Sequence, residues 1–175
     1  MSSSDDPPGK TGPALDIGRS WHDLLIAFAM YLAFSAAVHA IWEIVQLPLY
    51  TIWTEGSLGQ NVFALLHCTA GDVLIAAWSL LAALVLHGLR GWPQGRWFSV
   101  PAFAIIIASA YTGYSEWYNV HVKEAWVYTS AMPTFSVAGY AIGLTPMLQW
   151  LVVPAVAFAL VRRVRKNRLS AAQTT

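Results

Sequence analysis

The sequence predicts an all-α integral membrane protein, a bundle of four transmembrane helices with the N- and C-termini in the cytoplasm. Of its 175 residues, 57% are hydrophobic and only 11% are charged, whereas a soluble domain usually carries about 25% charged residues. Four apolar segments of membrane-crossing length and an uneven distribution of Lys and Arg complete the prediction. The sequence has no basic patch with interleaved aromatic residues, which excludes nucleic acid as a partner.

Each predicted span contains roughly the 20 apolar residues that an α-helix needs to cross the hydrocarbon core. The four spans cover about residues 23–47, 62–87, 98–120 and 144–161. They form one predicted transmembrane bundle over residues 23–163, between a disordered cytoplasmic tail (1–22) and a basic cytoplasmic tail (164–175). The expected location is therefore a membrane, the inner membrane if the protein is bacterial.

Nine of the ten Lys and Arg residues fall on one side of the predicted bundle. Only Lys123, between the third and fourth spans, falls on the other side. Short loops rich in Lys and Arg face the cytoplasm, so both termini are predicted to lie there. The nine residues on the cytoplasmic side are Lys10, Arg19, Arg90, Arg96, Arg162, Arg163, Arg165, Lys166 and Arg168.

The connection between the third and fourth spans, residues 121–143, is too irregular to be a span. Its sequence "HVKEAWVYTSAMPTFSVAGYAIG" is interrupted by Pro133, Gly139 and Gly143, residues that mark turns and loops. It is predicted to be an interfacial loop or a partly re-entrant segment. A lid over a chamber in the bundle is a further interpretation.

The stretch "HAIWEIVQLPLY", residues 39–50, places polar side chains inside the first apolar segment. His39, Glu43 and Gln46 are spaced at i, i+4 and i+7, which is one helix face. At a rise of about 1.5 Å per residue, Glu43 lies roughly 8 Å and His39 roughly 14 Å below the outer end near Pro48. An ionisable residue at such depth costs about 2.5 to 3.5 kcal/mol and indicates a function.

Further ionisable residues fall in the same outer half, namely His67 and Asp72 in the second span and Glu116 in the third. The three carboxyl groups are therefore expected to face one polar chamber. His67 and Asp72 are about 140° apart on an ideal helix, so one of them is expected to bond a neighbouring helix instead. The residues expected to bind substrate around this chamber are Trp42, Gln46, His67, Tyr111, Tyr114, Trp117, Asn119, Gln149 and Trp150.

The first interpretation of these polar groups is structural. Polar side chains between membrane helices hold the helices together, at about 0.6 kcal/mol per hydrogen bond. On this interpretation His39 would bond Asp72, and Gln149 would bond Glu116, without any chemistry.

The second interpretation is a metal site, because His39 and Glu43 can bind one ion from a single helix face. Imidazole and carboxylate groups suit zinc or iron. No H-x-x-H or C-x-x-C spacing supports this interpretation, and no cofactor is predicted. The residues that would complete the site are His67, Asp72, Glu116 and His121.

The third interpretation is acid–base chemistry on an apolar substrate. A carboxyl group in a low-dielectric pocket can stay protonated near neutral pH and donate its proton to an alkene. A neighbouring imidazole or carboxylate can take a proton from another carbon. Aromatic rings such as Trp42, Trp117 and Trp150 would stabilise the cation formed between these steps.

Three short segments give the chain a resemblance to a known family. They are "HAIWE" (39–43), "AYTGYSEWYN" (110–119) and "MLQWLVVP" (147–154). In these segments the chain resembles the emopamil-binding protein or EXPERA superfamily, which includes sterol Δ8-Δ7 isomerase and the sigma-2 receptor. The similarity covers most of residues 30–160, as scattered residues.

The resemblance implies a compact helical bundle whose cavity opens to the membrane. It implies that His39 and Glu43 belong to the proton-shuttling set and that Trp150 is an aromatic wall. Asp72 matches an acid that is usually Glu in the family. The isomerases carry an Asn where this chain has Met147, and Gln149 is expected to point elsewhere on the helix, which argues against a sterol as the substrate.

The predicted function is an intramembrane isomerase or cyclase that acts on an isoprenoid or sterol-like lipid through a protonated intermediate. The predicted catalytic residues are His39, Glu43, Asp72 and Glu116, with Glu43 and Asp72 as the acid–base pair. The alternatives are a lipid-binding or transport protein without turnover, and the metal-binding protein described above. The expected partner is an apolar lipid from the bilayer, and a homodimer is one assembly the sequence allows.

Overall fold

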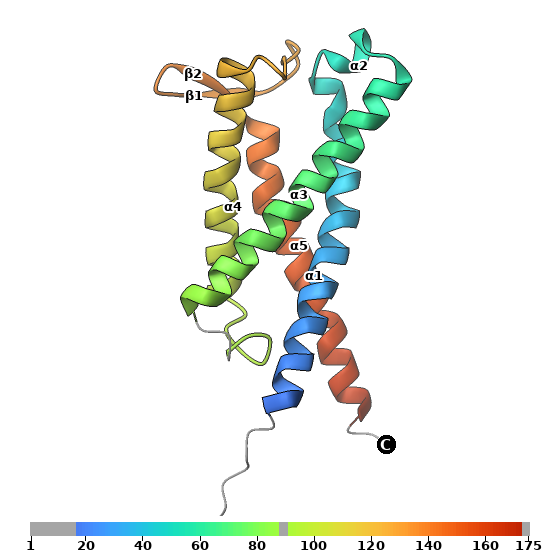
Figure 1. Cartoon of the computed structure of the whole chain (residues 1–175), viewed down its shortest axis with the longest axis vertical. Coiled ribbons are helices and arrows are strands. Elements are labelled where there is room, and N and C mark those ends of the chain that lie inside the picture. Colours follow the sequence, from blue (N-terminus) through green and yellow to red (C-terminus); the bar gives the residue numbers. More distant parts are fainter. Residues whose placement is uncertain (1–16, 88–90, 173–175) are drawn as a thin grey trace, which may run out of the picture.

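The computed structural model of the chain describes residues 17–87 and 91–172. Four long helices dominate it (Figure 1). They are α1 (Ile17–Gln46), α3 (Leu58–His87), α4 (Ser99–Trp117) and α5 (Leu144–Ala172). Outside the described residues lie most of the predicted N-terminal tail (1–16, with Lys10), Arg90 and the last three residues (173–175).

Three of these helices are long and apolar enough to cross a membrane, over Trp21–Leu49, Leu58–His87 and Leu144–Ala171. Their outer faces carry large apolar side chains that no part of the described protein covers; Val45 is 73% exposed and Trp78 is 70% exposed. Exposed apolar surface on this scale suits contact with lipid rather than water. The chain is therefore a multi-pass membrane protein.

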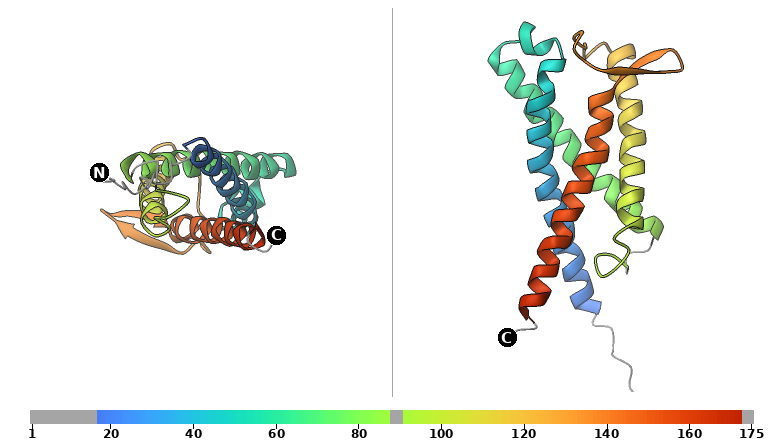
Figure 2. Two further views of the ribbon diagram at one scale, coloured as in Figure 1. Left: turned by 90° about the horizontal axis from the view of Figure 1, so that it is seen from below. Right: turned by 180° about the vertical axis from the view of Figure 1, so that it is seen from behind.

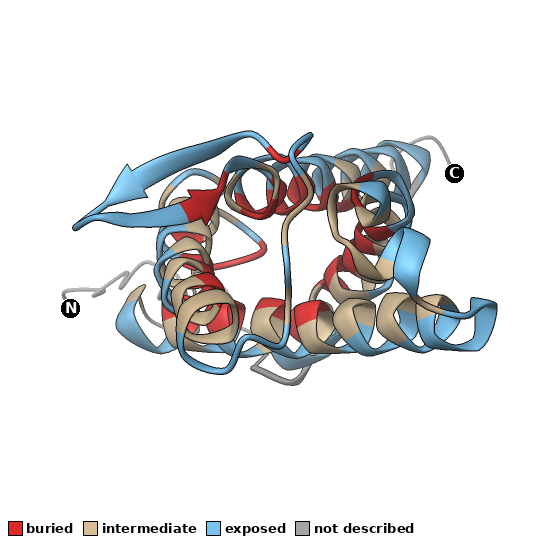
Figure 3. Ribbon diagram, turned by 90° about the horizontal axis from the view of Figure 1, so that it is seen from above, coloured by how far each residue is buried: buried red, intermediate tan, exposed pale blue. Residues whose placement is uncertain are grey.

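The four long helices are arranged around a square. α1 packs mainly against α3 and α5, and α4 packs mainly against the same two helices, as the view along the bundle shows (Figure 3). α1 begins and α5 ends at the same end of the bundle (Figures 1 and 2). We call this the terminal end and the opposite one the loop end.

Small side chains let the helices approach closely in the half of the bundle near the terminal end. Ala27, Ala83, Ala104 and Ala157 are each at most 1% exposed and belong to one apolar core. In lipid, helices associate through van der Waals contact rather than burial from water, so small residues at the interface favour close packing. The half near the loop end is different, because its interior is polar.

The helices extend beyond the predicted spans at three of their ends. α1 begins at Ile17 rather than near residue 23, α3 begins at Leu58 rather than near residue 62, and α5 continues to Ala172. Most of the predicted basic tail (164–175) is thus helical, because a helix need not stop where its apolar part leaves the hydrocarbon.

The first span ends close to its predicted limit. α1 is followed by a 3-10 turn, Leu47–Leu49, with Pro48 inside it, and by the short helix α2 (Ile52–Glu55). Proline cannot donate the backbone hydrogen bond that a continuing helix requires. This turn redirects the chain toward α3.

The all-α prediction is wrong in one respect, because part of residues 121–143 is a β-hairpin. Its strands are β1 (Thr134–Val137) and β2 (Tyr140–Gly143), paired antiparallel. Ala138 and Gly139 form the two-residue turn with positive φ angles of 51° and 87°, as a type I′ turn requires. Gly139 thus makes the hairpin turn, where its presence in the sequence had indicated an irregular loop.

The rest of this connection closes over the loop end of the bundle. After α4, a π-helical turn (Tyr118–Val122) leads into residues 123–133, which reach the α1–α2 connection and then return to the hairpin (Figure 1). The Thr51 amide donates to the Val127 carbonyl at 2.9 Å, and the Thr129 amide donates to the Leu49 carbonyl at 2.9 Å. We call residues 123–133 the strap.

Candidate acid–base site

The side-chain amide of Gln149 on α5 is the centre of a buried polar cluster. Its nitrogen lies 2.8 Å from His39 Nδ1, 2.9 Å from Glu43 Oε1 and 2.8 Å from Asp72 Oδ2. His39 Nδ1 also lies 3.3 Å from Asp72 Oδ2. These four side chains, from α1, α3 and α5, form what we call the acid–base cluster.

Gln46 extends the cluster toward the loop end. Its amide nitrogen donates to Glu43 Oε1 at 2.8 Å and to Gln149 Oε1 at 3.3 Å. Its own oxygen accepts a hydrogen bond of 3.1 Å from the indole of Trp42. On the other side, the ring of Trp150 lies 4.8 Å from the ring of His39, measured between centroids. An aromatic ring therefore borders the cluster directly.

The one-face prediction for α1 is confirmed. His39, Glu43 and Gln46 are all buried, with exposures of 0%, 7% and 5%, and all three contact Gln149. Asp72 is buried from the neighbouring helix α3, and its contact with His39 was part of the structural interpretation. Gln149, expected to point elsewhere on its helix, instead reaches every member of the cluster.

The cluster must hold protons to be tolerated in an apolar interior. Glu43 and Asp72 approach the same nitrogen atom, which has two hydrogens, one for each carboxyl group. Two buried carboxylates beside a neutral imidazole would leave a double negative charge in a low-dielectric medium, which is strongly unfavourable. Proton sharing within the cluster relieves this charge, so proton transfer is the chemistry that the arrangement allows.

Glu116 is buried too, at 3% exposure, but its hydrogen-bond partner lies in the strap. Tyr128 donates a hydrogen bond to Glu116 Oε2 and accepts one of 3.0 Å from the Gly143 amide. The predicted bond between Gln149 and Glu116 is therefore wrong, because each has a different partner. Burial raises the pKa of Tyr128, and the Glu116 charge raises it further, so the phenol remains a proton donor.

Tyr50 lies near both polar groups. Burial raises its pKa, and the nearby charges of Glu116 and Glu43 add to the effect. Its ring lies 5.6 Å from that of Tyr128. The part of the bundle near the loop end therefore holds two polar groups, the acid–base cluster and Glu116 with Tyr128.

Several predicted substrate-binding residues lie away from the cluster. His67 is exposed and stacks on Phe63 at 5.5 Å; the turn of the helix that brings Asp72 inside carries it outside. Tyr111 and Tyr114 are 53% and 57% exposed, because they share the outer face of α4. Asn119 bonds back to its own helix, at the Ser115 carbonyl.

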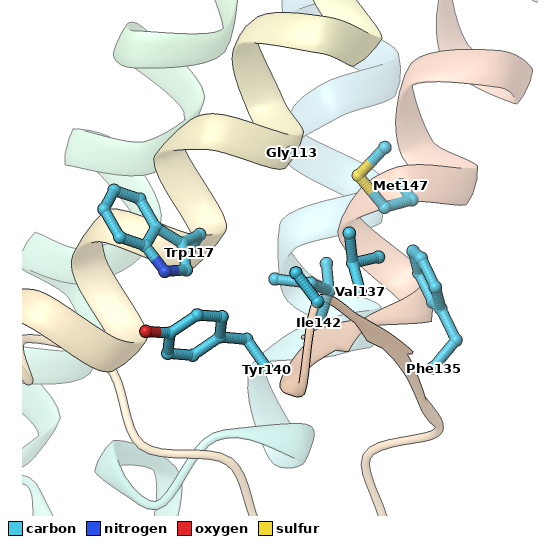
Figure 4. Close-up of a pocket in the computed structure, with 8 residues that line it drawn as sticks. Gly113, Trp117, Phe135, Val137, Tyr140, Ile142 and Met147 are labelled. Carbon is cyan, nitrogen blue, oxygen red and sulfur yellow. The ribbon is translucent and has the colours of Figure 1, made fainter.

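Trp117 lies in a different place, an apolar recess between α4, α5 and the hairpin (Figure 4). The recess has a volume of about 400 Å³. Met147 lines it, so the position at which the resembled isomerases carry Asn faces this recess and not the cluster. The residues that line it are Gly113, Trp117, Phe135, Val137, Ala138, Tyr140, Ile142 and Met147.

The six residues of the metal interpretation do not form one site. His39, Glu43 and Asp72 meet in the acid–base cluster, but the other three lie elsewhere. Within residues 17–87 and 91–172, no group of three or more His, Cys, Asp or Glu side chains is arranged to hold a metal ion. His67 and Glu116 have the separate surroundings described above, and His121 bonds the Ala141 carbonyl at 2.7 Å.

Sequence reasoning missed polar residues that the structure buries. Tyr31 and Ser35 are 0% exposed and precede His39 on the same face of α1. The four-residue steps from Tyr31 to Ser35 and from Ser35 to His39 were a signal in the sequence. However, an isolated hydroxyl in a membrane span is common and does not by itself indicate a site. Tyr128 gave no signal, because its role depends on how the strap folds back.

Comparison of the chain with models of protein families, with curated proteins and with solved structures gives no match.

Proposed function

We propose that the acid–base cluster catalyses a proton shift in an apolar lipid, as an intramembrane isomerase or cyclase for an isoprenoid or sterol-like molecule. The observation that carries the proposal is the convergence of His39, Glu43 and Asp72 on Gln149 Nε2, each within 2.9 Å. A cluster that allows proton transfer in an apolar interior suits a reaction that adds one proton and removes another.

The reaction needs no redox partner. One carboxylic acid of the Glu43–Asp72 pair donates its proton to an alkene carbon, so that a C–H bond forms as the O–H bond breaks. The resulting carbocation loses a proton from an adjacent carbon to the other carboxylate or to His39. The double bond has then moved, or a ring has closed, and the number of protons on the enzyme is unchanged.

The surroundings support these roles. Trp150, whose ring is 4.8 Å from that of His39, would stabilise the cation through its π face. Gln149 and Gln46 hold the carboxyl groups in position by hydrogen bonds. His39, Glu43 and Trp150, which carry the resemblance to the emopamil-binding proteins, are all in the cluster or beside it.

We propose the apolar recess as the place where the hydrocarbon part of the substrate binds. Its walls include Trp117, Phe135 and Met147, and none of its lining residues is charged. α5 contributes to both regions, since Met147 lines the recess and Gln149 is the centre of the cluster. α4 lines the recess with Gly113 and Trp117. A substrate would pass between these two helices to reach the cluster.

We further propose that α4 is the fourth transmembrane helix and that the terminal end faces the cytoplasm. α4 has 19 residues, about 28 Å at 1.5 Å per residue, close to the thickness of the hydrocarbon core. It packs against α3 and α5 and runs along the bundle with them (Figure 2). The uneven distribution of Lys and Arg supports the orientation, and Glu116 would serve as a third acid near the outer surface.

The experiment is lipid analysis of membranes that contain the wild-type protein or Glu43→Gln, in D2O. A transferable enzyme proton exchanges with solvent, so wild-type turnover is expected to place one deuterium in each rearranged lipid molecule. Glu43→Gln keeps the size of the side chain and should lower product formation by at least about 100-fold. Glu55→Gln, an exposed acid on α2, is the matched control and should match wild type. Unchanged product from folded Glu43→Gln would disprove the proposal.

A second candidate is a lipid-binding protein without turnover. Two observations favour it. The members of the cluster are each at most 9% exposed, and none of them lines the recess, so a lipid bound in the recess would not contact the cluster directly. On this alternative, lipid would co-purify unchanged and without deuterium, and Met147→Trp in the recess would reduce the amount bound while Glu43→Gln would not.

A further inference from the structure

A file of buried polar groups runs along α1 from the acid–base cluster toward the terminal end. Tyr31, Ser35, His39 and Glu43 are spaced four residues apart on one face of α1. The first three are 0% exposed, and Glu43 is 7% exposed. Successive members are separated by about 6 Å along the helix axis.

The polar atoms of this file have no hydrogen-bond partner within the described part of the protein. They are His39 Nε2, Ser35 Oγ and the Tyr31 hydroxyl. The Tyr31 hydroxyl lies within reach of Ser35 on the next turn and interacts with it. His39 uses Nδ1 in the cluster, and its other ring nitrogen, Nε2, is buried without a partner among the described residues.

Unsatisfied buried polar atoms are costly, at about 1 to 3 kcal/mol each, and three in a row on one helix face need an explanation. Exposure to the outside of the bundle does not explain them, because all three side chains are fully buried within it. A buried water with several polar partners satisfies such atoms, and Ser35 and His39 are successive polar groups on one buried helix face.

We propose that Tyr31, Ser35 and His39, bridged by water where they do not interact directly, form a proton path that leads from the acid–base cluster toward the terminal end of the bundle. Hydroxyl groups both donate and accept hydrogen bonds, and imidazole can bind a proton on one nitrogen and release one from the other. In each step one O–H or N–H bond forms as another breaks. A proton that binds His39 Nε2 releases the proton of Nδ1 to the Asp72 carboxylate 3.3 Å away.

Aromatic rings close the end of the path that is nearest to the terminal end of the bundle. Tyr31 stacks on Phe158 at 4.3 Å, and Phe158 meets the edge of Trp92 at 6.2 Å. Beyond Tyr31, Ala27 is 0% exposed and Leu24 is 7% exposed. The path therefore opens only when these side chains move, so it exchanges protons without being an open pore.

The path would let the proposed enzyme exchange the protons of its acid–base cluster with solvent. It rests on the proposed function only in requiring that the cluster holds an exchangeable proton. The test is infrared spectroscopy of the full-length protein in bilayers after transfer from H2O to D2O. The shift of the protonated-carboxyl band, assigned by its loss in Glu43→Gln and Asp72→Asn, reports exchange at the cluster.

Ser35→Ala and Tyr31→Phe are each expected to slow that exchange by at least about tenfold, equivalent to about 1.36 kcal/mol in the barrier. Ser35→Thr keeps a hydroxyl and should retain the wild-type rate. Thr112→Val is the matched control, because Thr112 on α4 is 6% exposed and its hydroxyl also lacks a partner among the described residues, yet it lies outside the file.

Equal exchange rates in wild type, Ser35→Ala and Tyr31→Phe would overturn the path, as would slowing of the same size in Thr112→Val. The small Ser35→Ala change gives a decision even if Tyr31→Phe does not fold. Lipid turnover plays no part in this measurement. Slowed exchange in the variants, without deuterated lipid from the wild type, would support the path and reject the enzyme. Deuterated lipid from the wild type, with unaltered exchange in the variants, would support the enzyme and reject the path.

Discussion

Gln149 Nε2 on α5 lies 2.8 Å from Asp72 Oδ2 on α3, and the same nitrogen contacts His39 and Glu43 on α1. One neutral amide thus joins three helices at the point where their ionisable groups meet. Without it, Asp72 and His39 would face each other in an apolar interior without the shared amide, and Glu43 would keep only the amide of Gln46 as a neutral donor.

Gln149→Leu is therefore expected to destabilise the protein, although leucine fits a membrane helix better than glutamine. The substitution removes the donor of Asp72 Oδ2 and one of the two donors of Glu43 Oε1. A buried acceptor left without a donor costs about 1 to 3 kcal/mol. Denaturation of the purified protein in mixed detergent micelles measures the loss. Leu151→Ala, at a position 52% exposed on the same helix, is the control and should change stability less. A Gln149→Leu protein as stable as wild type would show that the amide is dispensable.

Tyr128→Phe is expected to loosen the strap without affecting the helices. It removes the hydrogen bond to Glu116 and the acceptor of the Gly143 amide. Leaving a buried polar group without its partner costs about 1 to 3 kcal/mol, so amide hydrogen exchange in residues 123–133 should accelerate by about tenfold. Tyr114→Phe, on the exposed face of α4, should leave exchange unchanged. Equal protection of the strap in both variants would contradict its attachment through Tyr128.

The four-span topology predicts which loops share a side of the membrane. In a Cys68→Ser background, single cysteines at Ser57 and Ser136 should react with a membrane-impermeant maleimide from one side, and a cysteine at Gln94 from the other. Intact cells and inverted vesicles distinguish the two sides. If α4 does not cross, the cysteines at positions 94 and 136 will label from the same side.

The sequence by itself determined the class of protein and the polar face of its first span. A long run of apolar residues predicts a membrane helix wherever it packs, because the backbone must satisfy its hydrogen bonds within the segment. His39, Glu43 and Gln46 share a face for an equally local reason, the 3.6-residue turn. Neither conclusion requires knowledge of another helix.

Only the tertiary structure decided how the helices face one another. Spacing along α3 left His67 and Asp72 as equal candidates, and contact with α1 and α5 selected Asp72. The partner of Glu116 is Tyr128, twelve residues later in a segment whose path depends on a hairpin with a turn at Ala138 and Gly139. Gln149 became the centre of the site because α5 is rotated to point it inward, and that rotation is set by packing against neighbouring helices, which no local pattern in the sequence records.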